Sequence, residues 1–305
     1  MMKRPANFLL LTIFFVHFAI LVTYFIGNFD AIVHAKYVFA AEKPIQVEHQ
    51  PQIRTFNLED EGQADMVPVL MYHRIIDEND LTTVHFDEQG ELYGTIITLN
   101  QFEEQMKYLH DEEYTALTLH EFQAFMKEDL EVPKNSVLIT FDDGFKDNYV
   151  NAYPVLKEYG FHATLFMISG RIDRDPRDYD PLDAQFLSVA EIEAGADVFQ
   201  YMSHTHMFHE RDENGEAYLV SKDKESILTD IETSLYILGD KTAFAYPFGE
   251  YDDDTLDVLK ELEIEMAFTI QDGMAKRGDS LFEIPRRGIY HATTLEIFKN
   301  LITYE

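Results

Sequence analysis

The stretch 137–144 reads Val-Leu-Ile-Thr-Phe-Asp-Asp-Gly, a short apolar run that ends in two adjacent carboxylates and a glycine. The run has the length and the β-branched residues of a buried strand, so we expect the strand to end where Asp142 begins. Two neighbouring carboxylates repel each other, and a bound cation relieves that repulsion. Taken alone, the stretch would also fit a strand followed by an ordinary Asp-Gly turn.

A second polar cluster lies about sixty residues further on, where residues 203–209 read Ser-His-Thr-His-Met-Phe-His. Asp143 together with His204 and His209 would give three protein ligands and leave coordination positions open, which is the pattern of a catalytic metal site. His206 is the alternative ligand. Otherwise it faces the solvent or contacts the ligands without binding the ion itself. These ligand types predict a divalent ion, with zinc as the default and cobalt, nickel or iron as alternatives.

The composition limits the classes of protein and partner. The chain has 305 residues, 46% of them hydrophobic, no cysteine and a formal net charge of -32. It can bury a substantial core, but it can form neither a disulfide nor a thiolate metal site. The strong negative charge argues against nucleic acid as a partner. It suits a neutral or cationic ligand, or simply solubility outside the cell.

The amino terminus has the pattern of a membrane anchor. Lys3 and Arg4 precede a mostly apolar run over residues 8–26, long enough to cross a bilayer core as a helix. Positive residues ahead of the run place the amino terminus in the cytoplasm and the rest outside. Cleavage near Ala40-Ala41, which would release a secreted protein, is the alternative.

We therefore divide the chain into a transmembrane segment at 1–27, an extracellular linker at 28–66 and a catalytic domain at 67–305. Within the domain, strand and helix patterns alternate, which implies parallel strands with helical crossovers in either a barrel or an open α/β sheet. The predicted strands are 67–72, 137–141, 162–168, 198–202, 242–246, 266–270 and 282–285. The predicted helices are 100–109, 119–127, one ending at Tyr159, 223–238, 252–262 and 293–302.

Polar residues follow several of these strands at the end where active sites of parallel α/β folds are built. His73 follows the first strand, Asp142 and Asp143 the second, His204 a later one, and 247–249 (Pro-Phe-Gly) another. Asp142, beside the ion without being needed as a ligand, is suited to act as the general base. His73 could supply the general acid, although a single histidine after a strand is more often a hydrogen-bonded rim residue.

These motifs resemble those of the NodB-type polysaccharide deacetylases, carbohydrate esterase family four. Thr140–Gly144 looks like the signature in which the first aspartate is the base and the second binds the metal. His204–His209 resembles the histidine motif of that family, and Phe244–Gly249 resembles its third motif. The likeness covers about residues 67–305 and implies a distorted (β/α)7 barrel with metal-dependent deacetylase activity.

The sequence also departs from the common family pattern. The two histidines are five residues apart instead of four, Ala245 stands where many members have an arginine, and no Leu-x-Leu-His motif is present near the carboxyl end. The five-residue spacing, with the Tyr72-His73 pair ahead of the Asp-Asp strand, is similar to the branch that deacetylates poly-β-1,6-N-acetylglucosamine. The resemblance implies that His73 is the acid, and it leaves Arg286 or Arg287 to replace the missing arginine.

The resemblance also suggests residues that contact the substrate or support the site, namely Tyr72, His206, Tyr246, Pro247 and Phe248. We expect a membrane-anchored, metal-dependent N-deacetylase acting on N-acetylglucosamine units of an extracellular polysaccharide. Peptidoglycan, chitin oligomers and acetylated xylan are alternative substrates. Two other classes are a non-catalytic surface glycan-binding domain and a non-haem iron oxygenase. The intact ligand set disfavours the first, and the second does not explain Asp142.

Overall fold

The computed structural model describes residues 14–24, 44–45, 47, 53–58 and 62–303. Residues 14–24 form a helix. Among the described residues, no helix combines the length and apolar character that crossing a membrane requires. The predicted span at 8–26 extends at both ends into residues outside the described ranges.

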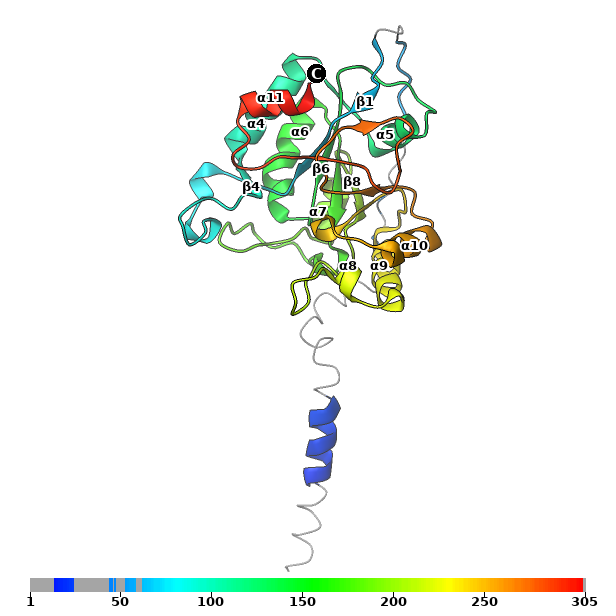
Figure 1. Ribbon diagram of the computed structural model, residues 1–305. Helices are drawn as coiled ribbons and strands as arrows, with labels where there is room; N and C mark the ends of the chain where they lie inside the picture. The colour runs from blue at the N-terminus through cyan, green and yellow to red at the C-terminus, as the bar shows by residue number, and fades with distance from the viewer. Residues whose placement is uncertain (1–13, 25–43, 46, 48–52, 59–61, 304–305) are drawn as a thin grey trace, which may run out of the picture.

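The domain is an α/β fold whose central sheet is a parallel half-barrel (Figure 1). Along the sheet the strand order is β10-β9-β8-β7-β6-β2-β12, and every neighbouring pair is parallel. Short β5 (Thr115–Ala116) pairs with the start of β6. The strands are β2 (Val69–Tyr72), β6 (Ser136–Phe141), β7 (Ala163–Met167), β8 (Phe199–Ser203), β9 (Phe244–Ala245), β10 (Ala267–Phe268) and β12 (Arg287–Gly288).

Alternation along β6 separates the two faces of the sheet. Ile139 and Phe141 belong to one core cluster, which also contains side chains of α4 (Leu99–Asp111), α6 (Tyr153–Tyr159) and α11 (Leu295–Ile302). Figure 1 shows these helices grouped on one side of the sheet. Leu138 belongs to a second cluster with side chains of the neighbouring strands and of α5 (Leu119–Met126). Successive strand residues point to opposite faces, so Asp142 follows on the same face as Leu138.

The remaining elements surround this sheet. Helices α9 (Lys224–Leu238) and α10 (Asp253–Glu261) pack on each other and on β9 in a third cluster. The sequence patterns did not predict the other short elements of the domain. These are β3 (Arg74–Ile76), β4 (Ile96–Thr98), β11 (Ala275–Lys276), α7 (Val189–Ala194) and α8 (Tyr218–Ser221), whereas β1 (Met66–Val67) overlaps the predicted strand 67–72.

Four strand predictions need correction, two of them only in length, because 242–246 and 266–270 are reduced to the two-residue strands β9 and β10. The predicted strand 67–72 is two strands, because Pro68 lacks the N–H that a continuous ladder would use, and β1 pairs with β11 in a separate small sheet. The predicted strand 282–285 is reduced to a single bridge between Ile284 and Phe268.

The chain from Leu281 to Ile289 connects the two edges of the half-barrel. Its first part bonds to the β10 edge, where Ala267 N–H donates to Leu281 O over 2.7 Å and Thr269 N–H to Ile284 O over 2.9 Å. Its last part is β12, which pairs with β2 at the opposite edge. Among the described residues this single irregular segment, rather than a regular ladder, spans the gap that a closed seven-stranded barrel would fill. It also carries Arg286 into the interior.

Parts of the segment assigned to a linker contact the domain. Ile45 is buried in the core, and its N–H donates to Ile237 O over 2.7 Å. The Arg54 guanidinium bonds to Glu121 at 2.6 and 2.7 Å and to Ala116 O at 2.8 Å. Glu121 also caps α5 with Thr118, so this ion pair fixes the described part of the segment to the start of a helix.

Candidate active site

Asp142 lies at the carboxyl end of β6 in a bidentate ion pair with Arg286. The two guanidinium nitrogens donate to the two carboxylate oxygens over 2.7 and 2.8 Å. Arg286 is fully buried and Asp142 is 3% exposed. Burial opposes ionisation of Asp142, but the charge and hydrogen bonds of Arg286 outweigh it and hold the pKa of this carboxyl at about 2. Asp142 is therefore fully ionised at neutral pH and fixed in orientation.

Asp143, His204 and His209 come together beside Asp142. Asp143 has a φ of 73°, a left-handed conformation that turns its side chain out of the strand direction. Its Oδ1 lies 3.8 Å from His204 Nε2 and 3.2 Å from His209 Nε2. One ligand atom from each of the three residues lies within 4.8 Å of the others. The spacing suits three ligands around one ion.

The protonation state of His204 supports a cation at this point. Its Nδ1 lies 2.7 Å from the carbonyl oxygen of Ala245, and since a carbonyl can only accept, Nδ1 carries the proton. Burial lowers the pKa of His204 to about 4, so the ring is neutral and Nε2 presents a lone pair toward Asp143. Oδ1 of Asp143 is buried and has no hydrogen-bond partner. Two lone pairs that face each other in a buried site fit a divalent cation between them.

His73 follows β2 on the same rim. It lies close enough to Asp142 to lower the pKa of that carboxyl. Its backbone carbonyl accepts a 2.7 Å bond from Asn148 Nδ2, which fixes the chain here. Its ring Nδ1 is buried without a hydrogen-bond partner. The His73 ring therefore lies beside the base with no protein partner at Nδ1.

Phe248 brings the third motif to the site. Its ring centroid lies 4.5 Å from that of His209, and the Arg211 guanidinium carbon lies 4.2 Å from the same centroid. The backbone of Phe248 is left-handed, with a φ of 58°. This turn places the Phe248 ring against His209, one of the candidate ligands. Phe248 itself remains partly exposed.

Other residues suggested as substrate contacts lie elsewhere. Tyr72 is fully buried in an aromatic cluster with Phe102 and Phe141, and its hydroxyl donates to Gln105 over 2.8 Å. Tyr246 is also fully buried. The structure therefore places both tyrosines in the core, Tyr72 at the end of β2 and Tyr246 directly after β9.

Tyr246 donates its hydroxyl to Phe282 O over 3.0 Å, and Pro247 beside it is buried.

Arg287 pairs with Asp272 at 2.6 Å, so it does not share the role of Arg286. Adjacent residues of an extended segment point to opposite sides, and only Arg286 points inward.

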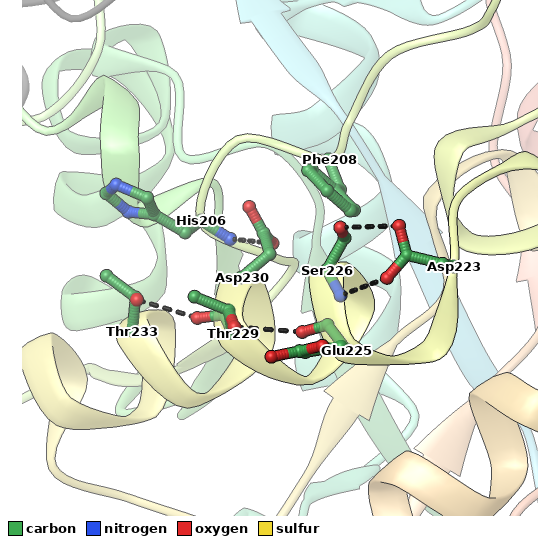
Figure 2. Close-up of a pocket in the computed structure, with 8 residues that line it drawn as sticks. All are labelled: His206, Phe208, Asp223, Glu225, Ser226, Thr229, Asp230 and Thr233. Carbon is green, nitrogen blue, oxygen red and sulfur yellow. Dashed lines mark hydrogen bonds between the residues drawn. The ribbon is translucent and has the colours of Figure 1, made fainter.

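His206 lies apart from the three candidate ligands. Its Nδ1 is 3.0 Å from the hydroxyl of Ser169, and its ring lines a cavity of about 630 Å³ formed with α9 (Figure 2). Burial lowers the pKa of His206 to about 4. Thr205, between the two histidines, has a left-handed backbone with a φ of 75° that breaks the extended chain, and the group of Asp143, His204 and His209 does not include His206.

Comparisons with known proteins identify the family. A profile of the polysaccharide deacetylase family matches residues 129–267. A poly-β-1,6-N-acetyl-D-glucosamine N-deacetylase of Staphylococcus aureus is 30% identical over 226 residues, covering 71% of this chain and 76% of its own. The chain belongs to the polysaccharide deacetylase family. Its homologues are named as N-deacetylases, so it is a hydrolase of carbohydrate esterase family four, in which catalysis depends on a metal.

Several solved structures have the same fold. The Streptococcus pyogenes deacetylase PplD, in complex with acetate, is 25% identical with a TM-score of 0.65 over 78% of this chain and 99% of its own. A polysaccharide deacetylase from Bacillus cereus is 30% identical with a TM-score of 0.58, covering 78% of this chain and 69% of its own. IcaB from Ammonifex degensii, 23% identical with a TM-score of 0.62 over 78% of this chain and 96% of its own, shares the fold.

Sequence reasoning missed the residues of this deacetylase that support the histidine loop. Asp230 and Ser234 lie on α9, on the buried side of the helix. A buried aspartate within an otherwise apolar helix face is the signal that could have drawn attention to this position.

Proposed function

We propose that this deacetylase removes acetyl groups from N-acetylglucosamine residues of an extracellular polysaccharide, most specifically poly-β-1,6-N-acetylglucosamine. The observation that carries the proposal is an ionised carboxylate, Asp142, held by Arg286 beside the converging side chains of Asp143, His204 and His209. The choice of polymer rests on the Staphylococcus aureus relative, which is named for it, and on the position of His73 ahead of the Asp-Asp strand. Peptidoglycan and chitooligosaccharides are the alternative substrates.

The proposed roles follow from the geometry. Asp143, His204 and His209 would hold a divalent ion, with zinc as the default for these ligands and cobalt, nickel or iron as alternatives. A base with a pKa of about 2 is weak, so it needs an acidified water and a polarised acetyl carbonyl, which is the chemistry that a bound divalent ion supplies.

Asp142 would accept a proton from the attacking water, while Arg286 keeps the carboxylate in place. His73 would donate a proton to the departing sugar amine as the carbon–nitrogen bond breaks. Phe248, packed on His209, would hold that ring and border the sugar. A non-catalytic glycan-binding domain would not need an ionised base beside three converging ligands.

The direct test measures acetate and free amine released from poly-β-1,6-N-acetylglucosamine by the purified protein. We expect chelation to abolish release and added zinc, cobalt or nickel to restore it. Full activity in metal-free protein would contradict the metal role. Faster acetate release from peptidoglycan or chitooligosaccharides would change the assigned substrate, but the assigned reaction, N-deacetylation, would stand.

We also propose that residues 8–26 anchor the protein in the cell membrane with the catalytic domain outside. The proposal rests on the apolar run and on Lys3 and Arg4 ahead of it. Protease added to intact cells should then digest the domain, and the full-length chain should fractionate with membranes. A shortened protein found only in the medium would instead support cleavage and secretion.

A further inference from the structure

The loop that carries the two histidines has little regular structure of its own. His204 follows β8, and the chain reaches His209 five residues later without a helix or strand between them. Thr205 has a φ of 75°, a conformation that is unfavourable for a β-branched residue. The N–H groups of such a loop need acceptors from elsewhere in the fold, because no secondary structure supplies them. The position of His209 therefore depends on what holds this loop.

Asp230 of α9 supplies these acceptors. Its Oδ1 accepts from His206 N–H over 2.8 Å and its Oδ2 from Met207 N–H over 2.7 Å. Figure 2 shows the carboxylate between α9 and the loop, with the bond from His206 marked. Asp230 is only 7% exposed. Its two oxygens thus hold two consecutive peptide groups of the histidine loop.

The charge of Asp230 strengthens these bonds. Burial raises the pKa of Asp230 to about 6, even though the N–H groups of Met207, His206 and Phe208 favour the ionised form. The carboxylate is therefore ionised at neutral pH. Bonds to an ionised acceptor are roughly twice as strong as bonds between neutral groups.

A second contact from α9 lies one helical turn further on. The Ser203 hydroxyl donates to the Ser234 hydroxyl over 2.8 Å and accepts from Thr205 N–H over 3.3 Å. Helix α9 is itself fixed, because Ile227 and Ile231 are fully buried in the cluster that it shares with α10. Hydrogen bonds therefore hold the loop against helix α9 at two points, Asp230 and Ser234.

We propose that Asp230 is a positioning residue, whose carboxylate sets the shape of the loop between His204 and His209 so that both imidazoles converge on Asp143. The inference rests on the proposed metal role of those three residues and deepens it. It also explains how a five-residue spacing can serve as a ligand pair, since Asp230 fixes the intervening peptides. A purely structural role for Asp230 would affect folding stability but not the metal site.

The test compares Asp230→Asn with the parent in the full chain. The amide keeps the shape and one acceptor oxygen, but it loses the charge and turns an NH2 group toward one of the two N–H donors. We expect zinc affinity, measured by competition with a chromophoric chelator, to fall by roughly 10- to 100-fold, the usual effect of removing a group that orients ligands. Saturating zinc should restore part of the lost turnover.

Thr233→Val is the matched control. Thr233 lies on the same helix and lines the same cavity, but its hydroxyl donates to Thr229 O of its own helix over 2.7 Å. This variant should keep the zinc affinity of the parent. Thermal unfolding of both variants separates a loss of stability from a loss of metal binding.

Zinc affinity of Asp230→Asn within about twofold of the parent, with or without a lower Tm, would overturn the positioning role. If Asp230→Asn does not yield folded protein, Asp230→Ser, which keeps a short oxygen acceptor, is judged by the same criterion. A parent protein that binds no divalent ion would instead refute the proposed function. The two failures are therefore distinguishable.

Discussion

Replacing Asp142 by asparagine should lower turnover by roughly 10²- to 10⁴-fold, the usual contribution of a general base, while the protein keeps its metal. The amide preserves the shape of the side chain but cannot accept a proton from water. The proposed ligands are untouched, so zinc bound per chain should equal that of the parent. Acetate release and metal content, measured on the same sample, check both parts of the expectation.

This substitution also removes the partner of a buried cation. Arg286 is fully buried, and leaving a buried charge unpaired typically costs about 3–5 kcal/mol. Turnover should therefore be measured well below the Tm of the variant, which thermal unfolding supplies.

His73→Ala serves as the companion to Asp142→Asn, because it tests the proton donor without disturbing the buried ion pair. It should also retain metal and lose turnover. Parent-like activity in His73→Ala would remove the acid assignment, and parent-like activity in Asp142→Asn would remove the base.

Replacing His204 by alanine should weaken zinc binding by more than about 100-fold, since groups that merely orient ligands already contribute 10- to 100-fold. The loss should be large because His204 is 2% exposed and its Nδ1 contact with the Ala245 carbonyl directs Nε2 toward Asp143. Among the described residues, the candidate ligand group consists of His204, Asp143 and His209, so the loss of His204 leaves two ligands. Zinc affinity by chelator competition measures the effect, and turnover should fall with it.

His206→Ala is the matched control, two residues further along the same loop. Its ring contacts Ser169 and the cavity against α9 rather than Asp143, and its backbone N–H remains available to Asp230. This variant should bind zinc as the parent does. The reverse pattern, with zinc lost in His206→Ala and kept in His204→Ala, would show that His206 is the ligand and that His204 is not.

Several elements could be predicted from the sequence because their signals are local. The run that ends at Asp142 predicted a buried strand, and β6 is found at Ser136–Phe141. Thr118 before an amphipathic run predicted the start of α5, and its capping box with Glu121 is present. Gly160 predicted the end of α6, and it takes the left-handed conformation that glycine allows, with a φ of 66°.

The short strands could not be predicted in this way. β3, β4, β11 and β12 have two or three residues each, too few to show a period. Whether such segments pair depends on the neighbours that the fold brings beside them.

The sequence by itself determined the family motifs and the order of the main strands and helices, and it predicted Asp142, Asp143, His204 and His209 as the site, because the two aspartates directly follow β6 and the histidine motif begins directly after β8. Only the tertiary structure decided between Arg286 and Arg287, placed Tyr72 and Tyr246 in the core, and separated His206 from the site. These outcomes depend on contacts between residues far apart in the chain, such as the pair of Arg286 with Asp142, 144 positions away. The direction in which a side chain points in an irregular segment is set by such distant partners, and local sequence carries no signal for them.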